Sequence, residues 1–380
     1  MIFFNNGATS YPKPKVVTDA VSQYITSTPI QSARAGLDDD AVDDAHSARE
    51  KIAKLFNTPD NDQIVFTSGS TEALNLAING IDLDGGHVVS TAIEHNSVIR
   101  PLMHLKEGGK VEVDFVKCNE HSEVAPKDIK AAMRDNTKAV VVNHSSNVTG
   151  SILDLKEIAK IAHDHDCPII VDASQSAGAI PIDVTDWDID YLAFTGHKSL
   201  FGLQGIGGLY IKKGHDPIPL KVGGTGIKSH ILVQPPGMPI YYEAGTPNMP
   251  GIVSLNAGVG FVLEQGVENI QKHKQEMVQT IINELSDFEQ VTHYVTSKEN
   301  SFANFCFNIR GMVPEEVGYI LESSYDFHVR TGLHCAPLLL EPIGVHPWGT
   351  VRASPSFFTT EEEIDSFIFS VKDVIRTFAK

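Results

Sequence analysis

Three segments of the chain combine polar residues with backbone turns suited to binding. The first is FTSGSTEALN, residues 66–75, where an apolar run ends in Ser and Thr residues and a helical pattern begins. Free N–H groups at a helix N-terminus, together with the hydroxyls of Ser70 and Thr71, can bind a phosphate. The segment lacks the Gly-Lys pair of a P-loop, so it does not indicate a nucleoside triphosphate. Ordinary capping of the helix by Ser70 or Thr71 is the alternative interpretation.

The other two segments supply a carboxylate and an amine. Asp172 ends the apolar run PIIVD, where a buried carboxylate needs a cationic partner because its desolvation is costly. A protonated pyridine nitrogen would serve, and a helix N-cap or a salt bridge is the alternative. Lys198 follows YLAFTGH and precedes a glycine-rich loop, where it can form a Schiff base with a carbonyl cofactor. For a lone lysine, a solvated loop charge is the alternative.

Together the three segments predict a site for pyridoxal 5′-phosphate (PLP). A phosphate cradle, a carboxylate for the ring nitrogen and a lysine for the aldehyde match the functional groups of this cofactor. Each segment follows an apolar run that reads as a strand. Because ligands of open parallel sheets bind outside the carboxyl ends of the strands, we expect the three segments to meet at one sheet edge.

The elements that must position these residues alternate between strand and helix from about residue 60 to 212. This alternation of nearly continuous apolar strands with amphipathic helices predicts an α/β domain around a mainly parallel sheet. The expected strands are 63–69, 87–93, 111–117, 138–146, 168–174, 191–196 and 207–213. The expected helices are 70–80, 97–109, 127–135 and 155–166.

The rest of the chain predicts a smaller α+β domain. Residues 214–250 are rich in Gly and Pro and are expected to form loops. A long helix is expected over about 251–286. The remaining pattern indicates strands at 291–297, 303–311, 327–332 and 350–354, with helices at 314–324 and 360–378. We therefore divide the chain into a large domain, 14–260, and a small domain made of 1–13 and 261–380.

Composition restricts the class of protein. The 380 residues are 42% hydrophobic and 21% charged, which is typical of a globular enzyme. The formal net charge of −18 argues against nucleic acid or an anionic membrane as a partner. No apolar run reaches the ~20 residues of a spanning helix, and the N-terminus does not read as a signal peptide. These features predict a cytoplasmic protein.

The four cysteines are scattered and form no CxxC pair, which argues against a disulfide framework or a zinc site. Cys118, Cys167 and Cys306 lie in or beside strand patterns and are expected to pack as small hydrophobes. HDHDC, residues 163–167, is interpreted as a helix end and not as a metal site, and no metal is expected. LDDDAVDD, residues 37–44, is interpreted as a helix start.

The order of the motifs resembles the cysteine desulfurase family. The motifs are TSGSTEALN, EHNS, SNVTG, VDASQSAG, TGHK, EAGTPN, RTGLHCA and VRAS, and the match runs from about Asn5 to Arg352. That family belongs to the class V aminotransferase group, so the resemblance implies the aspartate-aminotransferase-type fold of PLP-dependent transferases (fold type I). One departure is Leu333, where the related motif commonly has a second histidine.

The resemblance implies a role for each matching residue around PLP. His95 would stack on the pyridine ring and assist proton transfer, and Gln175 would bond the phenolic oxygen. Thr246 in EAGTPN would reach the phosphate of a neighbouring subunit, which implies a homodimer with shared sites. The residues implied to bind the phosphate within the same subunit are Ser70, Thr71, Thr195 and His197.

The resemblance also implies the substrate, L-cysteine. Arg352 would bind its carboxylate with two parallel hydrogen bonds, Asn147 would touch the cofactor or that carboxylate, and Arg330 would shape the same pocket. Lys198 would move the Cα proton. Cys335, as a thiolate, would take the sulfur as a persulfide and leave L-alanine. His334, Arg330 and the cationic cofactor region would help Cys335 to ionise.

Rival activities stay open at this point. The motifs also fit a selenocysteine lyase, a cystine or cysteine-sulfinate lyase, or a class V aminotransferase for another amino acid. A PLP-binding partner protein without catalysis is the alternative from a different class. The joint presence of Lys198, Asp172, His95 and Arg352 speaks against it, because a binder needs no electron sink. A sulfur-acceptor protein is compatible with the desulfurase interpretation.

Overall fold

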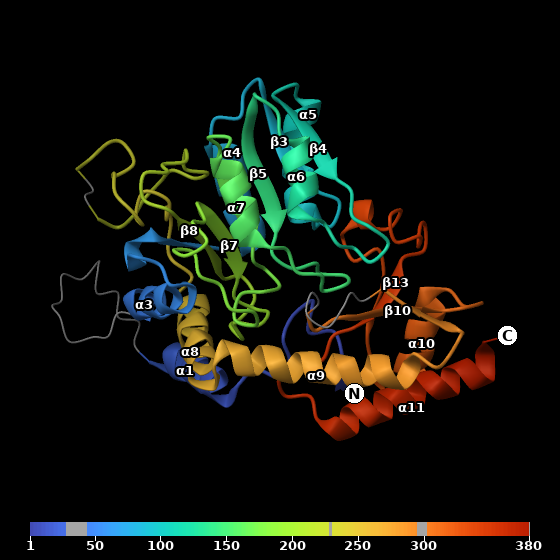
Figure 1. Ribbon diagram of the computed structural model, residues 1–380. Helices are drawn as coiled ribbons and strands as arrows, with labels where there is room; N and C mark the ends of the chain where they lie inside the picture. The colour runs from blue at the N-terminus through green and yellow to red at the C-terminus, as the bar shows by residue number, and fades with distance from the viewer. Residues whose placement is uncertain (28–43, 228–229, 295–301, 380) are drawn as a thin grey trace.

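The computed structural model describes residues 1–27, 44–227, 230–294 and 302–379. Its main body is a seven-stranded sheet with helices on both faces, and a smaller sheet lies beside it (Figure 1). The acidic stretch 37–44 lies outside the described residues except for Asp44, where helix α3 (Asp44–Phe56) begins. None of the described helices has the length and apolar character needed to cross a membrane.

The seven-stranded sheet has the order β2-β8-β7-β6-β5-β3-β4. Strands β3 to β7 pair in parallel, whereas β8 is antiparallel to both of its neighbours, so the prediction of a mainly parallel sheet is confirmed. The strands are β2 (Ile64–Thr67), β3 (Gly86–Thr91), β4 (Val111–Val116), β5 (Thr137–Asn143), β6 (Ile169–Asp172), β7 (Tyr191–Thr195) and β8 (Gly207–Ile211).

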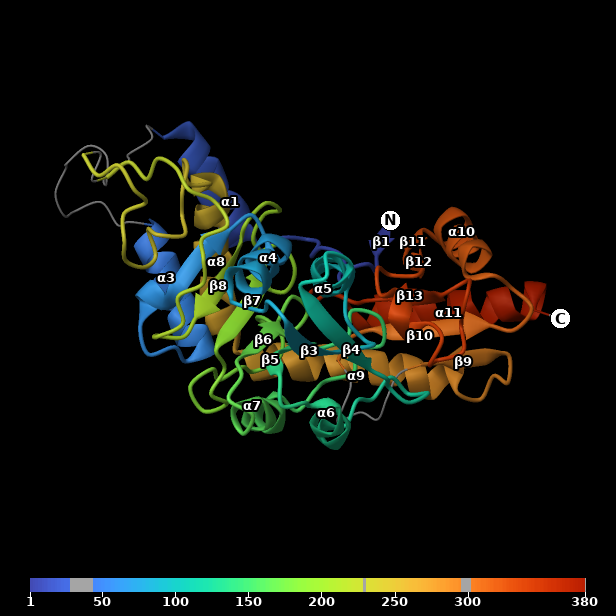
Figure 2. The ribbon, with the colours of Figure 1, turned by 90° about the horizontal axis from the view of Figure 1, so that it is seen from above.

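The strands alternate their side chains between two apolar layers. In β5, Val140 and Val142 pack in one cluster with α3 and α7, and Ala139 and Val141 pack in another with α4 and α5. Burial on both faces explains why these strands read as continuous apolar runs. Figure 2 shows α4 and α5 on one side of the sheet and α6 and α7 on the other. These helices are α4 (Ser70–Gly80), α5 (Asn96–Glu107), α6 (Pro126–Ala132) and α7 (Leu155–His163).

The smaller sheet is antiparallel and has the order β12-β13-β10-β9. Its apolar face packs with α9, α10 and α11 around Phe305, Phe307 and Phe367. The N-terminal arm joins this part, because β1 pairs with β11 and Phe4 is buried in the same cluster. The elements are β1 (Ile2–Phe3), β9 (Val291–His293), β10 (Phe305–Ile309), α10 (Pro314–Tyr325), β11 (Phe327–His328), β12 (Arg330–Gly332), β13 (Thr350–Ala353) and α11 (Glu361–Phe378).

Two expectations differ from the structure. The single helix expected over 251–286 is broken into α8 (Met249–Gln265) and α9 (Val267–Leu285). Gly266 lies between them with φ +82°, a conformation that favours glycine and ends a helix. The strand expected over 327–332 is split between two sheets, as β11 and β12. Helix α1 (Lys15–Thr26) was not predicted, whereas α3 begins at Asp44, the last residue of the stretch interpreted as a helix start. The proposed division of the chain at residue 260 stays a prediction.

Candidate active site

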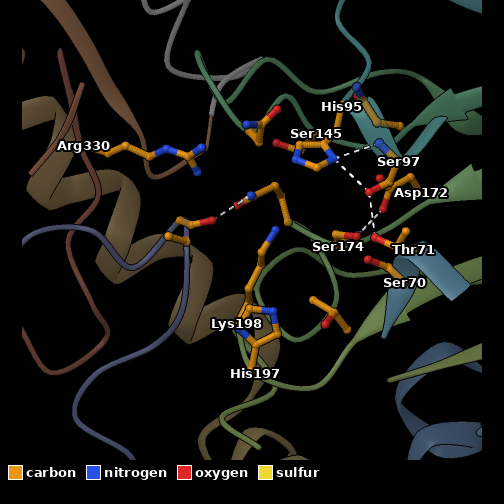
Figure 3. Close-up of a pocket in the computed structure, with 16 residues that line it drawn as sticks. Ser70, Thr71, His95, Ser97, Ser145, Asp172, Ser174, His197, Lys198 and Arg330 are labelled. Carbon is orange, nitrogen blue, oxygen red and sulfur yellow. Dashed lines mark hydrogen bonds between the residues drawn. The ribbon is translucent and has the colours of Figure 1, made fainter. Parts of the chain in front are cut away.

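A cavity of about 220 Å³ lies at the carboxyl edge of the central sheet (Figure 3). Its walls come from the ends of β2, β3, β5, β6 and β7, and from the N-terminal arm and β12. The expectation that the three polar segments meet at one sheet edge is confirmed. The predicted site residues that line the cavity are Ser70, Thr71, His95, Asn147, Asp172, Gln175, Thr195, His197, Lys198 and Arg330.

The first turn of α4 forms one end of the cavity. Gly69 is the N-cap of this helix and no side chain caps it, so the alternative in which Ser70 or Thr71 caps the helix is wrong. The Thr71 hydroxyl instead lies 2.8 Å from the Ser97 hydroxyl. Nearby, the Nδ1 atom of His197 is buried and has no hydrogen-bond partner among the described residues. The uncapped N–H groups and these polar side chains can hold an anionic group.

Asp172 ends β6 with 5% of its surface exposed. Its Oδ1 atom accepts hydrogen bonds from the Ser174 backbone N–H, at 2.9 Å, and from the Ser174 hydroxyl. In the described part of the chain, no Lys, Arg or His side chain lies within salt-bridge distance of it. The salt-bridge alternative therefore does not hold, and the carboxylate faces the cavity in need of a cationic or donor partner.

His95 is the N-cap of α5 and is held in a short chain of hydrogen bonds. Its Nδ1 atom accepts from the Ser97 backbone N–H at 3.0 Å, which places the ring proton on Nε2. The Ser97 hydroxyl lies 2.9 Å from Nδ1 and also contacts Thr71. Burial, opposed by the charge of Asp172 and assisted by that of Lys198, lowers the pKa of His95 to about 4. The ring is therefore neutral at pH 7.

Lys198 projects its amine into the cavity from the loop after β7 (Figure 3). Burial lowers the pKa of Lys198 to about 8, with nearby Asp172 opposing the shift and the two arginines Arg352 and Arg330 adding to it. An amine with a pKa near neutrality can act as a nucleophile and as a base. The solvated loop charge that a lone lysine suggests is not what the structure shows.

Cys335 lies beside the cavity in an unusual turn. His334 and Cys335 have φ angles of +51° and +60°, which non-glycine residues adopt only when their surroundings hold them. Asn96 N–H donates to the Cys335 carbonyl at 2.8 Å, and the Asn147 amide donates to the His334 carbonyl at 2.7 Å. The Arg330 Nη2 atom lies 3.2 Å from the Cys335 sulfur.

The charge beside this sulfur comes from Arg330 and not from His334. Burial and the neighbouring arginines keep the pKa of His334 well below its usual value, so its ring is neutral. Its Nε2 atom lies 3.0 Å from the Thr350 hydroxyl. The expectation that a His334 cation helps to ionise Cys335 therefore does not hold.

The other three cysteines pack inside the molecule, as the sequence predicts. Cys118, Cys167 and Cys306 are buried, whereas Cys335 is only half-buried. Burial raises the pKa of Cys118 and of Cys167 to about 11, and that of Cys306 to about 12. Cys335 is therefore the thiol best placed to react.

Arg352 and Thr246 do not line the cavity. Arg352 is fully buried, and its Nη1 atom donates to the Asn147 carbonyl at 2.6 Å. A side chain at Gly7, which does line the cavity, would place its Cβ atom 3.0 Å from the Arg352 guanidinium carbon. Arg352 therefore lies directly behind the cavity wall. Thr246 lines a second cavity together with Lys221.

Six residues that line the cavity were not predicted from the sequence. Ser97, Asn143, Ser145 and Ser174 end or follow strands or neighbour predicted site residues, and that position is the signal that would have found them, whereas Gly7 and Ala8 in the N-terminal arm carry no such signal. These additional residues are Gly7, Ala8, Ser97, Asn143, Ser145 and Ser174.

Comparisons with known proteins agree with this site. The family model described as aminotransferase class-V matches residues 2–367. A probable cysteine desulfurase from Methanothermobacter thermautotrophicus is 34% identical over 94% of this chain and 91% of its own length. One from Halalkalibacterium halodurans is 32% identical over 96% and 91%. The solved apo structure of a cysteine desulfurase from Thermococcus onnurineus has a TM-score of 0.91 and 30% identity, and covers 99% of this chain and 94% of that one.

The chain belongs to the class-V aminotransferases, a family of PLP-dependent enzymes with the α/β fold described above. Among them it is a member of the cysteine desulfurases, which act on an amino acid.

Proposed function

We propose that the protein converts L-cysteine to L-alanine and takes the sulfur onto Cys335 as a persulfide. The observation that carries this proposal is the 3.2 Å contact between Arg330 and the Cys335 sulfur. Arg330 also lines the cavity that holds Lys198. The Cys335 thiol and the Arg330 cation therefore lie beside the cavity that contains the Lys198 amine. A cation beside sulfur favours the thiolate, which is the reactive form.

The cavity residues fit PLP. Three groups support this fit: the uncapped start of α4, the Nδ1 atom of His197, which has no hydrogen-bond partner among the described residues, and the carboxylate of Asp172, whose Oδ1 atom is bonded to Ser174 but which has no cationic partner among the described residues. When bound, PLP supplies an aldehyde that takes up the amino group of the substrate and a ring that draws electrons from its Cα atom. Ser70, Thr71, Thr195 and His197 would hold the phosphate.

The other cavity residues would orient the ring. Asp172 would accept the proton of the ring nitrogen, Gln175 would bond the phenolic oxygen, and His95 would lie against the ring face. The Gln175 amide already donates to the Gly7 carbonyl at 3.0 Å, which fixes its orientation. Lys198 would hold the cofactor aldehyde as a Schiff base until the substrate arrives.

Lys198 then serves as the base at the substrate Cα atom. Its lowered pKa of about 8 makes the free amine available near neutral pH. The Cys335 thiolate attacks the substrate sulfur, so that an S–S bond forms as the Cβ–S bond breaks. The electron pair stays with the carbon fragment, which takes up a proton and leaves as L-alanine. The balance is L-cysteine plus the Cys335 thiol giving L-alanine plus the Cys335 persulfide.

Arg352, Arg330 and Asn147 would recognise the substrate carboxylate. The guanidinium of Arg352 lies behind Gly7 and donates to the Asn147 carbonyl. A substrate carboxylate could reach this guanidinium because Gly7 has no side chain in between. We further propose a homodimer in which Thr246 reaches the phosphate of the partner subunit. A cytoplasmic location is proposed from the free state of the cysteines and from the sequence.

The test compares the wild type with Cys335→Ala. Alanine is measured from L-cysteine and from L-selenocysteine in the presence of PLP and a reducing thiol, together with the sulfide released from the first and the selenide released from the second. We expect alanine from L-cysteine with the wild type and its loss with the variant. Selenocysteine can still react with the variant, because selenium is the better leaving group. Sulfur transfer at the full rate by Cys335→Ala would refute the persulfide step.

A further inference from the structure

A groove runs from Cys335 along the outer faces of α4 and α5, which lie side by side (Figure 2). It has a volume of about 480 Å³ and shares Thr71, His95 and Ser97 with the active-site cavity. This volume falls within the ~300–1,000 Å³ of sites that bind small molecules. The groove therefore joins the cavity to the surface and passes the thiol on the way.

Most residues that line the groove come from α4 and α5. Asn96, Arg100 and His104 follow one another at intervals of four residues on α5, so they share one helix face. On α4 the matching stripe is Thr71, Asn75 and Asn79. The Asn96 N–H also holds the Cys335 carbonyl, so the α5 stripe starts at the reactive loop.

The groove has the chemistry of an anion site. No Asp or Glu is among the residues that line it, although the chain as a whole carries a net charge of −18. Arg100 is exposed and has no hydrogen bond or ion pair with any described residue. Asn75 and Asn79 donate to atoms of their own helix. Arg100 is thus a charged donor of the groove with no partner among the described residues, one helical turn beyond the start of α5, where Asn96 holds the Cys335 loop.

We propose that this groove binds the sulfur acceptor, and that the acceptor is a small thiol carrying a carboxylate. This inference rests on the proposed function. The carboxylate pairs with Arg100 while the acceptor thiolate attacks the outer sulfur of the Cys335 persulfide. The new S–S bond forms on the acceptor as the bond to the Cys335 sulfur breaks. Cys335 leaves as a thiolate, and no external oxidant or reductant is needed.

The acceptor test uses two thiols that differ in charge, N-acetylcysteine and its uncharged amide. The enzyme is first loaded with L-cysteine, and transfer is then followed by mass spectrometry as loss of the outer sulfur from the Cys335 peptide. We compare the wild type, Arg100→Gln and the control Lys110→Gln, which removes the same charge just beyond the end of α5. The ratio of the transfer rate to N-acetylcysteine over the transfer rate to its amide should fall about two- to five-fold in Arg100→Gln and stay unchanged in Lys110→Gln. This is the range for the loss of an exposed ion pair.

A second measurement does not depend on turnover. Cys335 is alkylated with iodoacetate and with iodoacetamide, and the ratio of the two rates at this cysteine reports the charge of the groove. Arg100→Gln should lower this ratio, and Lys110→Gln should leave it unchanged. Added salt should lower it in the wild type, because salt screens an exposed cation.

Different results would refute the proposed function and the acceptor assignment. A wild type that forms no alanine refutes the proposed function and the acceptor assignment with it. If the enzyme forms alanine but Arg100→Gln has the same ratio of transfer rates to the two thiols as the wild type, the acceptor assignment alone is refuted. That result is expected if the acceptor is a protein that docks elsewhere. An alkylation ratio that is unchanged in Arg100→Gln, or that falls equally in Lys110→Gln, shows that the groove does not select anions.

Discussion

Glu94 precedes His95 and offers a direct test of the electrostatics behind the cavity. It is fully buried, and its Oε1 atom accepts hydrogen bonds from the Thr91 hydroxyl at 2.5 Å and from the Asn143 N–H at 3.0 Å. Its Oε2 atom has no partner among the described residues. Burial, together with the charge of Asp172, raises the pKa of Glu94 to about 8. Glu94 is therefore protonated in the folded protein at pH 7.

A raised carboxyl pKa makes stability depend on pH. The unfolded chain loses this proton near pH ~4.3, but the folded chain keeps it until about pH 8. Folding therefore takes up a proton between these values, and Glu94 lowers the stability progressively as the pH rises through that window. Each pH unit is worth ~1.4 kcal/mol. Between pH 5 and pH 8 the loss amounts to about 3 kcal/mol.

Glu94→Gln should remove this dependence. The glutamine carbonyl can accept the same two hydrogen bonds as Oε1, and the amide does not titrate. The difference in the free energy of unfolding between the variant and the wild type should therefore grow in favour of the variant by about 3 kcal/mol from pH 5 to pH 8. If the chain unfolds as one unit, this corresponds to about 4 °C in the melting temperature.

The assay is thermal unfolding of both proteins at half-unit steps from pH 5 to pH 8, followed by circular dichroism. Asp60→Asn is the matched control, since it changes an exposed carboxylate to an amide. Its melting temperature should keep the pH profile of the wild type. Parallel profiles for Glu94→Gln and the wild type would show that Glu94 ionises normally in the folded protein and would refute the reasoning.

Three further predictions concern the surroundings of the site. Gly7→Ala should raise the KM for L-cysteine more than it lowers kcat, because the new Cβ atom would lie 3.0 Å from the Arg352 guanidinium carbon. Arg330→Gln should slow alkylation of Cys335 by iodoacetamide at pH 7 by about tenfold, the loss of one charge-assisted hydrogen bond. Burial lowers the pKa of Lys274 to about 8, so its charged form destabilises the fold below that pH. Lys274→Met should therefore raise the melting temperature at pH 6, and the gain should shrink as the pH rises from 8 towards 10.5.

The sequence predicted the part of the site that depends on strand ends. Thr71, Asp172 and Lys198 each follow a continuous apolar strand, and a parallel sheet brings such ends to one edge whatever the details of packing. The hydrophobic pattern carries this information directly. The α/β class, the parallel core and the cofactor-binding motifs were therefore accessible before the structure.

The part of the site that depends on register was not accessible. Arg330 pairs with Arg352 across β12 and β13, so the two side chains lie on the same face of the small sheet, where Arg330 lines the cavity and Arg352 is buried. Local periodicity does not specify which residues of two distant strands are opposite each other. The charge of His334 also depended on burial, which its neighbours in sequence do not show. The break at Gly266 and the cavity residues that follow strand ends were missed although each had a local signal.

The N-terminal arm links the two sheets around the site. Phe4 is buried in the core of the small sheet, Gly7 lines the cavity, and the Ser10 N–H donates to the His197 carbonyl at 2.9 Å. Asn147, in the loop after β5, also links the part built on the large sheet to the part built on the small sheet, because its amide donates to the His334 carbonyl. The two sheets are thus tied together across the site by contacts of the chain itself. Because these contacts form on folding, the ordering entropy of this part of the site is lost at folding and not at substrate binding.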